Sequence, residues 1–431
     1  MNKEIRQAYA VLQKVYKKNA FAGIELNKTI QREQGNVNTK LVTKLVYGVI
    51  EKDITLNYFV SKFIKSYPNV DVEIVLKLGA YILHNINSIP AYACINELVE
   101  MTKVISDRYT AGFVNATLKN IAKQKITYPD RDKNIVKYLS VRYSYPEWVV
   151  KQLLKEQTTD FVEELLSTSL STLTHIRILE DKIDVPKFIQ ILDKNKVEYT
   201  RSAMSDTLYV EYSELLKIGD LSKTYIVQGL PSMIVARNIK EGSNYVLDLC
   251  ASPGGKSVYI AQHNENTMVT SCDVSDVRVE LIKKYANAYN VKNIEVVKND
   301  ATVLREDWIG KYDTVLCDVP CSNLGIANKK PDVLVNKDPN CIQEITELQL
   351  QILKTASNYI KPGGVLLYST CSILKEENEK IVGKFLQENK DYKILNVDTS
   401  GVDVVRYHNL CTFYPNISKC EGFFVGKLEK K

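Results

Sequence analysis

Apolar residues in the first 125 positions recur at the spacing of helices. Segments 5–16, 71–86 and 94–105 place apolar side chains every three or four residues, which predicts helices with one or more buried faces. The stretch 87–90, which ends in proline, interrupts the pattern between the last two segments. We therefore predict an all-α helical bundle over residues 1–125.

The pattern loosens from residue 126 onward. Residues 126–146 carry two prolines and many charges, which is typical of a linker, and they run into a predicted helix at 147–155. Further along, short β-like runs alternate with a helical stretch at 185–194. The prediction for residues 126–235 is a linker followed by a small α/β module of the RRM-like kind.

After residue 236 the chain alternates between apolar strands and helical stretches. This rhythm predicts a doubly wound, largely parallel sheet in a third domain, residues 236–431. The whole chain is thus predicted to be a multidomain α plus α/β protein. The expected strands are Tyr245–Cys250, Met268–Asp273, Ile294–Lys298, Tyr312–Cys317, Val365–Ser369 and Phe423–Leu428.

Length and composition are those of a soluble globular protein with more than one domain. The chain has 431 residues, of which 45% are hydrophobic and 25% charged. Its first residues mix charged and apolar types, so we expect neither a signal peptide nor a membrane partner, and we predict a cytoplasmic location. The nine cysteines include no C-x-x-C pair, and there are only four histidines, so no metal site is expected.

Positive charge is concentrated at the N-terminal end. Residues 1–125 hold 18 Lys and Arg against 10 Asp and Glu, which is +8, whereas the remainder holds 39 against 41, which is −2. A basic module on a near-neutral body suggests a nucleic-acid partner. A solvated lysine-rich surface would have the same composition, so charge alone leaves both interpretations open.

The stretch LDLCASPGGKS, residues 247–257, resembles the end of a phosphate-binding P-loop. A P-loop requires glycine where Cys250 stands, and Asp248 at the strand end would repel phosphates. Gly254 and Gly255 still allow backbone N–H groups to approach a ligand closely. We therefore expect a cofactor loop here, although not one for a nucleoside triphosphate.

Carboxylates follow the next two strands of the predicted sheet. Asp273 ends the second strand, where it could accept ribose hydroxyls, and Asp300 ends the third, near the expected adenine. Lys256 could pair with a ligand carboxylate. Each aspartate alone could be a helix cap, but their shared position predicts an adenosine cofactor with an amino-acid tail.

Two cysteines follow the fourth and fifth strands, in DVPCSNLG and LYSTCSILKEENE. Cys321 and Cys371 would then lie at the same sheet edge as the cofactor loop, where two thiols suit methylation of a carbon that is not itself nucleophilic, such as cytosine C5. Asp318 could hydrogen-bond the base. A helix starting just after Cys371 is expected to lower the pKa of its thiol. The residues alone do not decide which thiol attacks.

These motifs resemble the RNA cytosine-5 methyltransferases related to bacterial 16S ribosomal RNA methyltransferase B, the Sun protein family. The resemblance rests on residues 247–257, 318–332 and 368–379, and on EGFFVGKL near the C-terminus. Segments within 45–121 are similar to the NusB-like RNA-binding domain of that family, and 143–150 resembles its connector. The likeness therefore covers practically the whole chain.

The resemblance implies a Rossmann-like class I methyltransferase domain that uses S-adenosylmethionine. It assigns the nucleophile to Cys371 and product release to Cys321. The implied partner is ribosomal RNA, 16S in particular, with no DNA partner and a monomeric protein. The implied cofactor-binding residues are Cys250, Ala251, Ser252, Pro253, Gly254, Gly255, Lys256, Asp273, Arg278, Asp300 and Asp318.

Four places depart from the family pattern, and one of them is the stretch PDVLVN, residues 331–336, which lacks the usual aromatic end. Asn323 replaces a usual glycine, Ala327-Asn328 replace a pair that often includes arginine, and Gly229 follows Gln228 where aspartate is common. These changes leave the target nucleotide and the docking of RNA open. The rival interpretations are a methyltransferase for transfer RNA or 23S ribosomal RNA, a DNA cytosine methyltransferase, a catalytically silent RNA-binding assembly factor and a P-loop ATPase.

Overall fold

The chain divides into two compact units. The computed structural model describes residues 3–33, 35, 37–170, 173–335 and 338–431. Unit 1 comprises residues 1–167 together with 330–339, and unit 2 comprises residues 168–329 and 340–431. In the described part of the chain, no helix combines the length and apolar character needed to cross a membrane.

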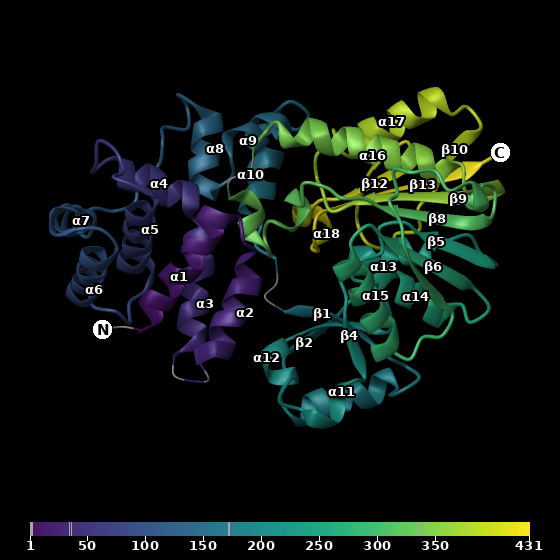
Figure 1. Cartoon of the computed structure of the whole chain (residues 1–431), viewed down its shortest axis with the longest axis horizontal. Coiled ribbons are helices and arrows are strands. Elements are labelled where there is room, and N and C mark those ends of the chain that lie inside the picture. Colours follow the sequence, from purple (N-terminus) through teal and green to yellow (C-terminus); the bar gives the residue numbers. More distant parts are fainter. Residues whose placement is uncertain (1–2, 34, 36, 171–172, 336–337) are drawn as a thin grey trace. The chain divides into compact units, whose positions relative to one another are not determined.

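Unit 1 is helical (Figure 1). Asparagine or aspartate side chains cap several of its helices; Asn69, for example, accepts a hydrogen bond from the N–H of Val72 at 3.0 Å. The helices are α1 (Lys3–Lys18), α2 (Ala22–Glu33), α3 (Thr39–Glu51), α4 (Asp53–Ser61), α5 (Val70–Asn85), α6 (Ala91–Ile105), α7 (Arg108–Ile121), α8 (Ile135–Tyr143), α9 (Glu147–Leu154) and α10 (Thr159–Ser167).

Helix α5 forms the centre of unit 1. It contacts α1, α3, α4, α6 and α7, and it is buried on nearly all sides because its residues are mostly apolar. Lys77 is a polar exception at 3% exposure, and its ammonium pairs with Asp53 at 2.7 Å and Glu73 at 2.6 Å. A buried cation with two carboxylate partners avoids the cost of an unpaired charge.

A segment from the C-terminal half of the sequence completes unit 1. The short 3-10 helix η4 (Pro331–Leu334) packs against α3, and Val335 contacts the helical core. Asp332 accepts a hydrogen bond from the N–H of Ala22, the first residue of α2, at 3.0 Å. A carboxylate at a helix N-terminus satisfies one of its free N–H groups and complements the helix dipole.

Unit 2 begins with a small antiparallel sheet in the strand order β2-β3-β1-β4. Helix α11 packs on it through Phe188 and Leu192, which are fully buried. The elements are β1 (Thr174–Ile178), α11 (Val185–Lys194), β2 (Tyr199–Arg201), β3 (Thr207–Val210), α12 (Tyr212–Leu215), η1 (Gly219–Leu221) and β4 (Tyr225–Val227).

The remainder of unit 2 is built on a nine-stranded mixed sheet. Strands β9-β8-β5-β6-β7 are parallel neighbours, and β13 pairs antiparallel with β9 and carries β12 and β10. The strands are β5 (Tyr245–Asp248), β6 (Met268–Asp273), β7 (Ile294–Lys298), β8 (Tyr312–Asp318), β9 (Ile360–Thr370), β10 (Tyr392–Leu395), β11 (Val405–Tyr407), β12 (Leu410–Phe413) and β13 (Phe423–Lys430).

Helices cover both faces of this sheet (Figure 1). Alternate strand residues point to opposite layers: Leu247 packs in the cluster with α16 and α17, and Val246 in the cluster with α13 and α14. The helices are α13 (Leu230–Arg237), α14 (Gly255–His263), α15 (Asp276–Ala288), η2 (Glu306–Trp308), η3 (Leu324–Ile326), α16 (Cys341–Ser357), α17 (Glu379–Glu388) and α18 (Pro415–Ser418).

The predicted fold class is confirmed, with additions. All six predicted strands of the third domain exist, and the predicted helix at 185–194 is α11 with the same bounds. Strands β10, β11 and β12, each of three or four residues, are not among the predicted strands. Helix α8 lies within the stretch interpreted as a linker. The domain boundaries at residues 125 and 235 remain predictions.

Candidate active site

The cofactor loop connects the carboxyl end of β5 to the start of α14. The N–H of Ala251 donates to the carbonyl of Cys272 in β6 at 2.8 Å, which fixes the loop to the neighbouring strand. Gly254 then turns into the helix with φ of +111°, a conformation that favours glycine because a Cβ is strained there. The first N–H groups of α14 therefore begin beside the strand end.

Asp248, the last residue of β5, is fully buried. Its Oδ2 accepts a hydrogen bond from Ser257 at 2.7 Å, while its Oδ1 has no partner in the described part of the chain. Burial raises the pKa of Asp248 to about 6, although Ser257 and Lys256 favour the ionised form. A buried carboxylate oxygen without a partner fits a ligand that supplies a positive charge or a hydrogen-bond donor.

Lys256 and Asp318 form a partly buried ion pair beside this loop. The Lys256 ammonium lies 2.5 Å from Oδ2 of Asp318, and Ser369 donates to Oδ1 of Asp318 at 2.7 Å. The ammonium also lies 5.5 Å from the centre of the Phe423 ring. Burial alone would lower the pKa of Lys256, but the charges of Asp318 and Asp248 more than offset it and raise that pKa.

A cavity of about 220 Å³ opens at this loop. It brings together seven of the predicted residues, namely Cys250, Ala251, Ser252, Pro253, Gly255, Lys256 and Asp318. Gln228, Gly229, Ser232, Asp248 and Tyr285 line it as well, although they were not among the predicted site residues. Gln228 follows β4 of the small sheet and donates to the carbonyl of Gly255 at 3.0 Å, a link that no local pattern indicates.

The other predicted cofactor residues do not line this cavity. Asp273 is buried at the end of β6, where it accepts from the N–H of Ser275 at 3.2 Å and lies 3.8 Å from Arg278. Asp300 is exposed, and Thr302 donates to it from both its N–H and its hydroxyl. These two bonds lower the pKa of Asp300. Asp273, Arg278 and Asp300 remain predictions as ligand contacts.

Cys321 and Cys371 lie side by side. Cys321 follows β8, Cys371 follows β9, and their sulfur atoms are 2.8 Å apart, longer than the 2.05 Å or so of a disulfide bond. The predicted convergence of the two thiols at one sheet edge is confirmed. Asn323, with φ of +62°, accepts a hydrogen bond from the Cys371 thiol at 2.8 Å.

The environments of the two thiols differ from the expectation in one respect. Helix α17 begins only at Glu379, so the prediction that a helix starts directly after Cys371 is wrong. The hydrogen bond with Cys371, burial, and the nearby charge of Glu377 raise the pKa of Cys321 well above its usual range. Burial likewise raises the pKa of Cys250, which agrees with an unreactive thiol there.

The cysteine loops meet the last strand through two glycines. The N–H of Gly325 donates to the carbonyl of Cys371 at 2.9 Å, and the N–H of Gly422 donates to the carbonyl of Gly325 at 2.8 Å. A Cβ on Gly325 would lie 2.1 Å from the carbonyl oxygen of Gly422. Only glycine at residue 325 allows the loop after Cys321 to lie this close to the loop before β13.

Gly325→Ala is therefore expected to destabilise unit 2 by about 1–3 kcal/mol, the usual cost of overpacking. Thermal unfolding measured by calorimetry checks this. Gly383→Ala is the matched control, because a Cβ on Gly383 in α17 would meet no atom within 4 Å and alanine favours helix. Equal melting temperatures for the Gly325→Ala variant and the wild type would contradict the expectation.

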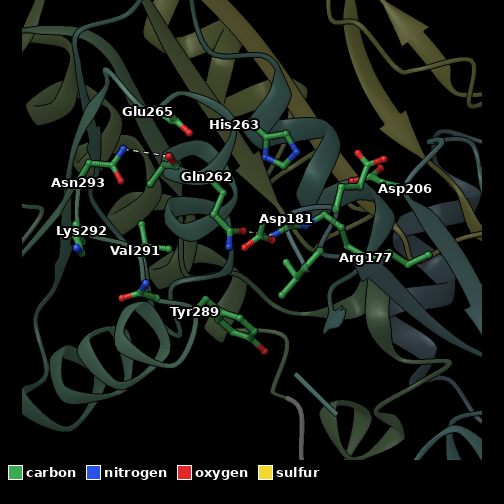
Figure 2. Close-up of a pocket in the computed structure, with 15 residues that line it drawn as sticks. Arg177, Asp181, Asp206, Gln262, His263, Glu265, Tyr289, Val291, Lys292 and Asn293 are labelled. Carbon is green, nitrogen blue, oxygen red and sulfur yellow. Dashed lines mark hydrogen bonds between the residues drawn. The ribbon is translucent and has the colours of Figure 1, made fainter. Parts of the chain in front are cut away.

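A second cavity, of about 530 Å³, contains none of the predicted site residues. It lies between β1 and the ends of α14 and α15, and Figure 2 shows Arg177, Gln262 and Tyr289 around it. Arg177 is 3% exposed and donates to Gln262 at 2.6 Å, and burial lowers its pKa. This second cavity is larger than the cavity at the cofactor loop, but none of its fifteen lining residues is a cysteine.

Comparison with known sequences agrees with this two-part architecture. Residues 235–429 match the family described as 16S rRNA methyltransferase RsmB/F, and residues 3–123 match the NusB family. The probable ribosomal RNA small subunit methyltransferase B of Bacillus subtilis (strain 168) is 29% identical and covers 98% of both chains. The ribosomal RNA small subunit methyltransferase B of Enterobacter sp. (strain 638) is 25% identical and covers 93% of both.

Solved structures share the fold. The crystal structure of PH0851 covers 100% of this chain and 99% of its own, with a TM-score of 0.83 and 24% identity. That of NSun6 from Pyrococcus horikoshii with SFG covers 70% of this chain and 98% of its own, with a TM-score of 0.54 and 22% identity. At these identities the likeness is one of fold.

Proposed function

Because residues 235–429 match the RsmB/F family of methyltransferases and residues 3–123 match the NusB family, we propose that this chain methylates C5 of a cytosine in 16S ribosomal RNA. The methyl donor in this proposal is S-adenosylmethionine. The observation that carries the proposal is the pair of free thiols, Cys321 and Cys371, beside the cavity that Lys256 and Asp318 line.

The cavity suits the proposed cofactor. S-adenosylmethionine carries a sulfonium, an ammonium and a carboxylate, and the unpartnered Oδ1 of Asp248 is a fitting acceptor for a cationic or N–H group. The N-terminus of α14 at Gly255 suits a carboxylate. SFG, an analogue of S-adenosylmethionine, is present in the solved neighbour NSun6, which supports the same cofactor class here.

Asp248 provides a direct test of cofactor binding. Its pKa of about 6 means that the carboxyl gains a proton as the pH falls through about 6. Affinity for the cationic cofactor should therefore fall between about pH 7 and about pH 5. Asp248→Asn should weaken binding about ten- to hundredfold at about pH 7, since one hydrogen bond to a charged group is lost. Its affinity should then vary little with pH, as measured by calorimetric titration.

Ser232→Ala is a suitable control, since Ser232 lines the same cavity, carries no charge and is not among the predicted cofactor-binding residues. If the wild type and Asp248→Asn show the same pH dependence, Asp248 is not the titrating contact.

The two thiols supply the chemistry that the reaction needs. The Cys371 thiolate adds to C6 of the cytosine, so that the electron pair of the C5–C6 double bond becomes available at C5. C5 then forms a bond to the methyl carbon of the donor, and the donor sulfur leaves with the electron pair of the broken bond as a neutral thioether. A base removes the C5 proton, the double bond re-forms and Cys371 is eliminated.

Cys321 is suited to the last step. The largest cause of its raised pKa is the hydrogen bond with the Cys371 thiol, and this bond is removed once Cys371 is bonded to C6. Cys321 can then release its own proton to water and, as the thiolate, accept the C5 proton. Asp318 lies at the same sheet edge and can accept a hydrogen bond from the amino group of the base. The target base must leave its stack to reach a thiol held in a loop at the sheet edge.

Methyl transfer to defined RNAs tests the proposal. Radiolabelled S-adenosylmethionine is incubated with 16S ribosomal RNA, 23S ribosomal RNA, transfer RNA and a DNA copy of the 16S sequence. We expect label in 5-methylcytosine of 16S ribosomal RNA alone, identified after nuclease digestion. Label in another RNA would support the alternative substrates. No label in any of these nucleic acids, together with no affinity for S-adenosylmethionine, would support a silent RNA-binding factor instead.

A further inference from the structure

A buried carboxylate connects the two cysteine loops. Glu377 lies in the turn between β9 and α17 and is 0% exposed. Its Oε1 accepts hydrogen bonds from the hydroxyls of Ser322 and Ser372, both at 2.5 Å. Its Oε2 accepts from the N–H of Ser322 at 2.8 Å and from Gln349 at 3.1 Å.

The two serines occupy equivalent places. Ser322 directly follows Cys321, and Ser372 directly follows Cys371, and the two hydroxyl oxygens lie 3.2 Å apart. Each hydroxyl donates to Glu377 and also accepts from the N–H two residues further along its own loop, at Leu324 and Leu374. Each serine therefore shapes the turn that carries its cysteine while it is bonded to the same carboxylate.

An uncharged side chain could not make the same set of bonds. Two hydroxyls, one backbone N–H and one side-chain amide all donate to Glu377, and a carboxylate offers only acceptors, on two oxygens. A glutamine would place an NH2 group where a donor already points. The buried charge thus has donors on both oxygens, which is the condition for burying it without a cation.

We infer that Glu377 is a positioning residue that holds the Cys321 and Cys371 thiols in contact by binding Ser322 and Ser372 with one carboxyl group. The inference rests on the proposed function for its catalytic consequences. Glu377 does not touch the reacting atoms; it acts through the loops that carry them. Misplacing either thiol by an ångström is enough to slow a reaction that needs aligned groups.

The geometry can be tested without any substrate. Phenylarsine oxide bridges two neighbouring thiols and releases one water, and mass spectrometry of peptides locates the bridge. The wild type should form a bridge between Cys321 and Cys371, and Glu377→Gln should form it about tenfold more slowly or not at all. Glu376→Gln, which alters the adjacent carboxylate that pairs with Lys380 at 2.7 Å, is the matched control and should behave as wild type.

The kinetic test separates the two loops. Ser372→Ala should slow formation of the covalent adduct with RNA containing 5-fluorocytosine, because Cys371 attacks. Ser322→Ala should leave adduct formation unchanged and slow multiple turnover, because Cys321 acts in release. Glu377→Gln should show both defects, with kcat reduced about ten- to hundredfold and the affinity for S-adenosylmethionine unchanged. The double variant Glu377→Gln, Ser372→Ala should then have a kcat only slightly below that of Glu377→Gln alone.

Each outcome has one meaning. Wild-type rates of bridging and of both steps in Glu377→Gln would overturn the inference. If Glu377→Gln fails to fold, the two serine variants decide, and identical defects in both would also overturn it. If the wild type methylates no RNA, the proposed function fails, while the arsenical bridge still tests the positioning by Glu377.

Discussion

Cys371→Ala is expected to abolish methyl transfer to RNA and to abolish the covalent adduct with RNA containing 5-fluorocytosine. A base can remove the C5 proton of cytosine but cannot remove fluorine from C5. In the wild type, the attacking cysteine therefore remains bonded to C6 after methyl transfer. Alanine has no group that can add to C6, and the remaining thiol, Cys321, is held in a different loop, which follows β8 instead of β9. Turnover should fall by about 10⁴-fold or more, as when other enzymes lose their nucleophile.

The measurement is denaturing electrophoresis of protein and labelled RNA, with single-turnover rates alongside. Cys341→Ala is the matched control, because Cys341 is a half-buried thiol at the first residue of α16 and not at the sheet edge. Affinity for S-adenosylmethionine should stay unchanged in both variants. An adduct that persists in Cys371→Ala and disappears in Cys321→Ala would reverse the proposed roles.

Cys321→Ala is expected to stop the enzyme after one turnover, with Cys371 still bonded to the methylated base. The sulfur of Cys321 lies 2.8 Å from that of Cys371, so it is placed to take the C5 proton and allow elimination. Without it, water must serve as the base. Removing a positioned general base typically costs about 10²- to 10⁴-fold, and the adduct should accumulate on ordinary cytosine RNA.

Here the sensitive measurement is the stoichiometry of methyl groups incorporated per protein molecule. Cys321→Ala should give a burst close to one methyl group, followed by almost no turnover, whereas the wild type continues. Heating in denaturant should leave the RNA attached to the variant. A variant that turns over at the wild-type rate with no trapped adduct would show that Cys321 has no part in release.

The larger elements of the fold could be predicted because their signals are local. Strands β6 and β8 have six and seven residues and are rich in types that favour strands, such as valine, threonine and tyrosine, and α5 repeats apolar residues over four turns. Strand β11 has three residues, all exposed, and it exists because β12 pairs with it. Its position depends on tertiary contacts, which a single segment does not encode.

The sequence predicts those residues of the candidate site that directly follow a strand of the parallel sheet. Cys321 and Cys371 each follow a buried parallel strand, and parallel strands place their carboxyl ends at one edge. Gln228 and Tyr285 also line the cavity. Gln228 lies just after β4 and Tyr285 lies in α15, and no sequence motif indicates a ligand at either residue. Such residues are found only when the packing is known.

The segment after Cys371 shows why helix propensity was misleading there. Residues 372–378 are rich in types that favour an exposed helix, yet Glu377 and Asn378 are fully buried. Asn378 accepts from Thr370 at 2.5 Å and donates to the carbonyl of Ser372 at 3.0 Å, which holds the chain in turns. These tertiary bonds outweigh a weak local preference.

The placement of η4 has a consequence for how the protein can be divided. Residues 330–339 follow the Cys321 loop in sequence, yet they belong to unit 1, where Asp332 caps α2 and η4 packs on α3. A cut at residue 167 would therefore separate the helical unit from a piece of its own fold. Unit 1 is encoded in two stretches of the gene, and the methyltransferase sequence cannot be exchanged between relatives without carrying part of the helical unit with it.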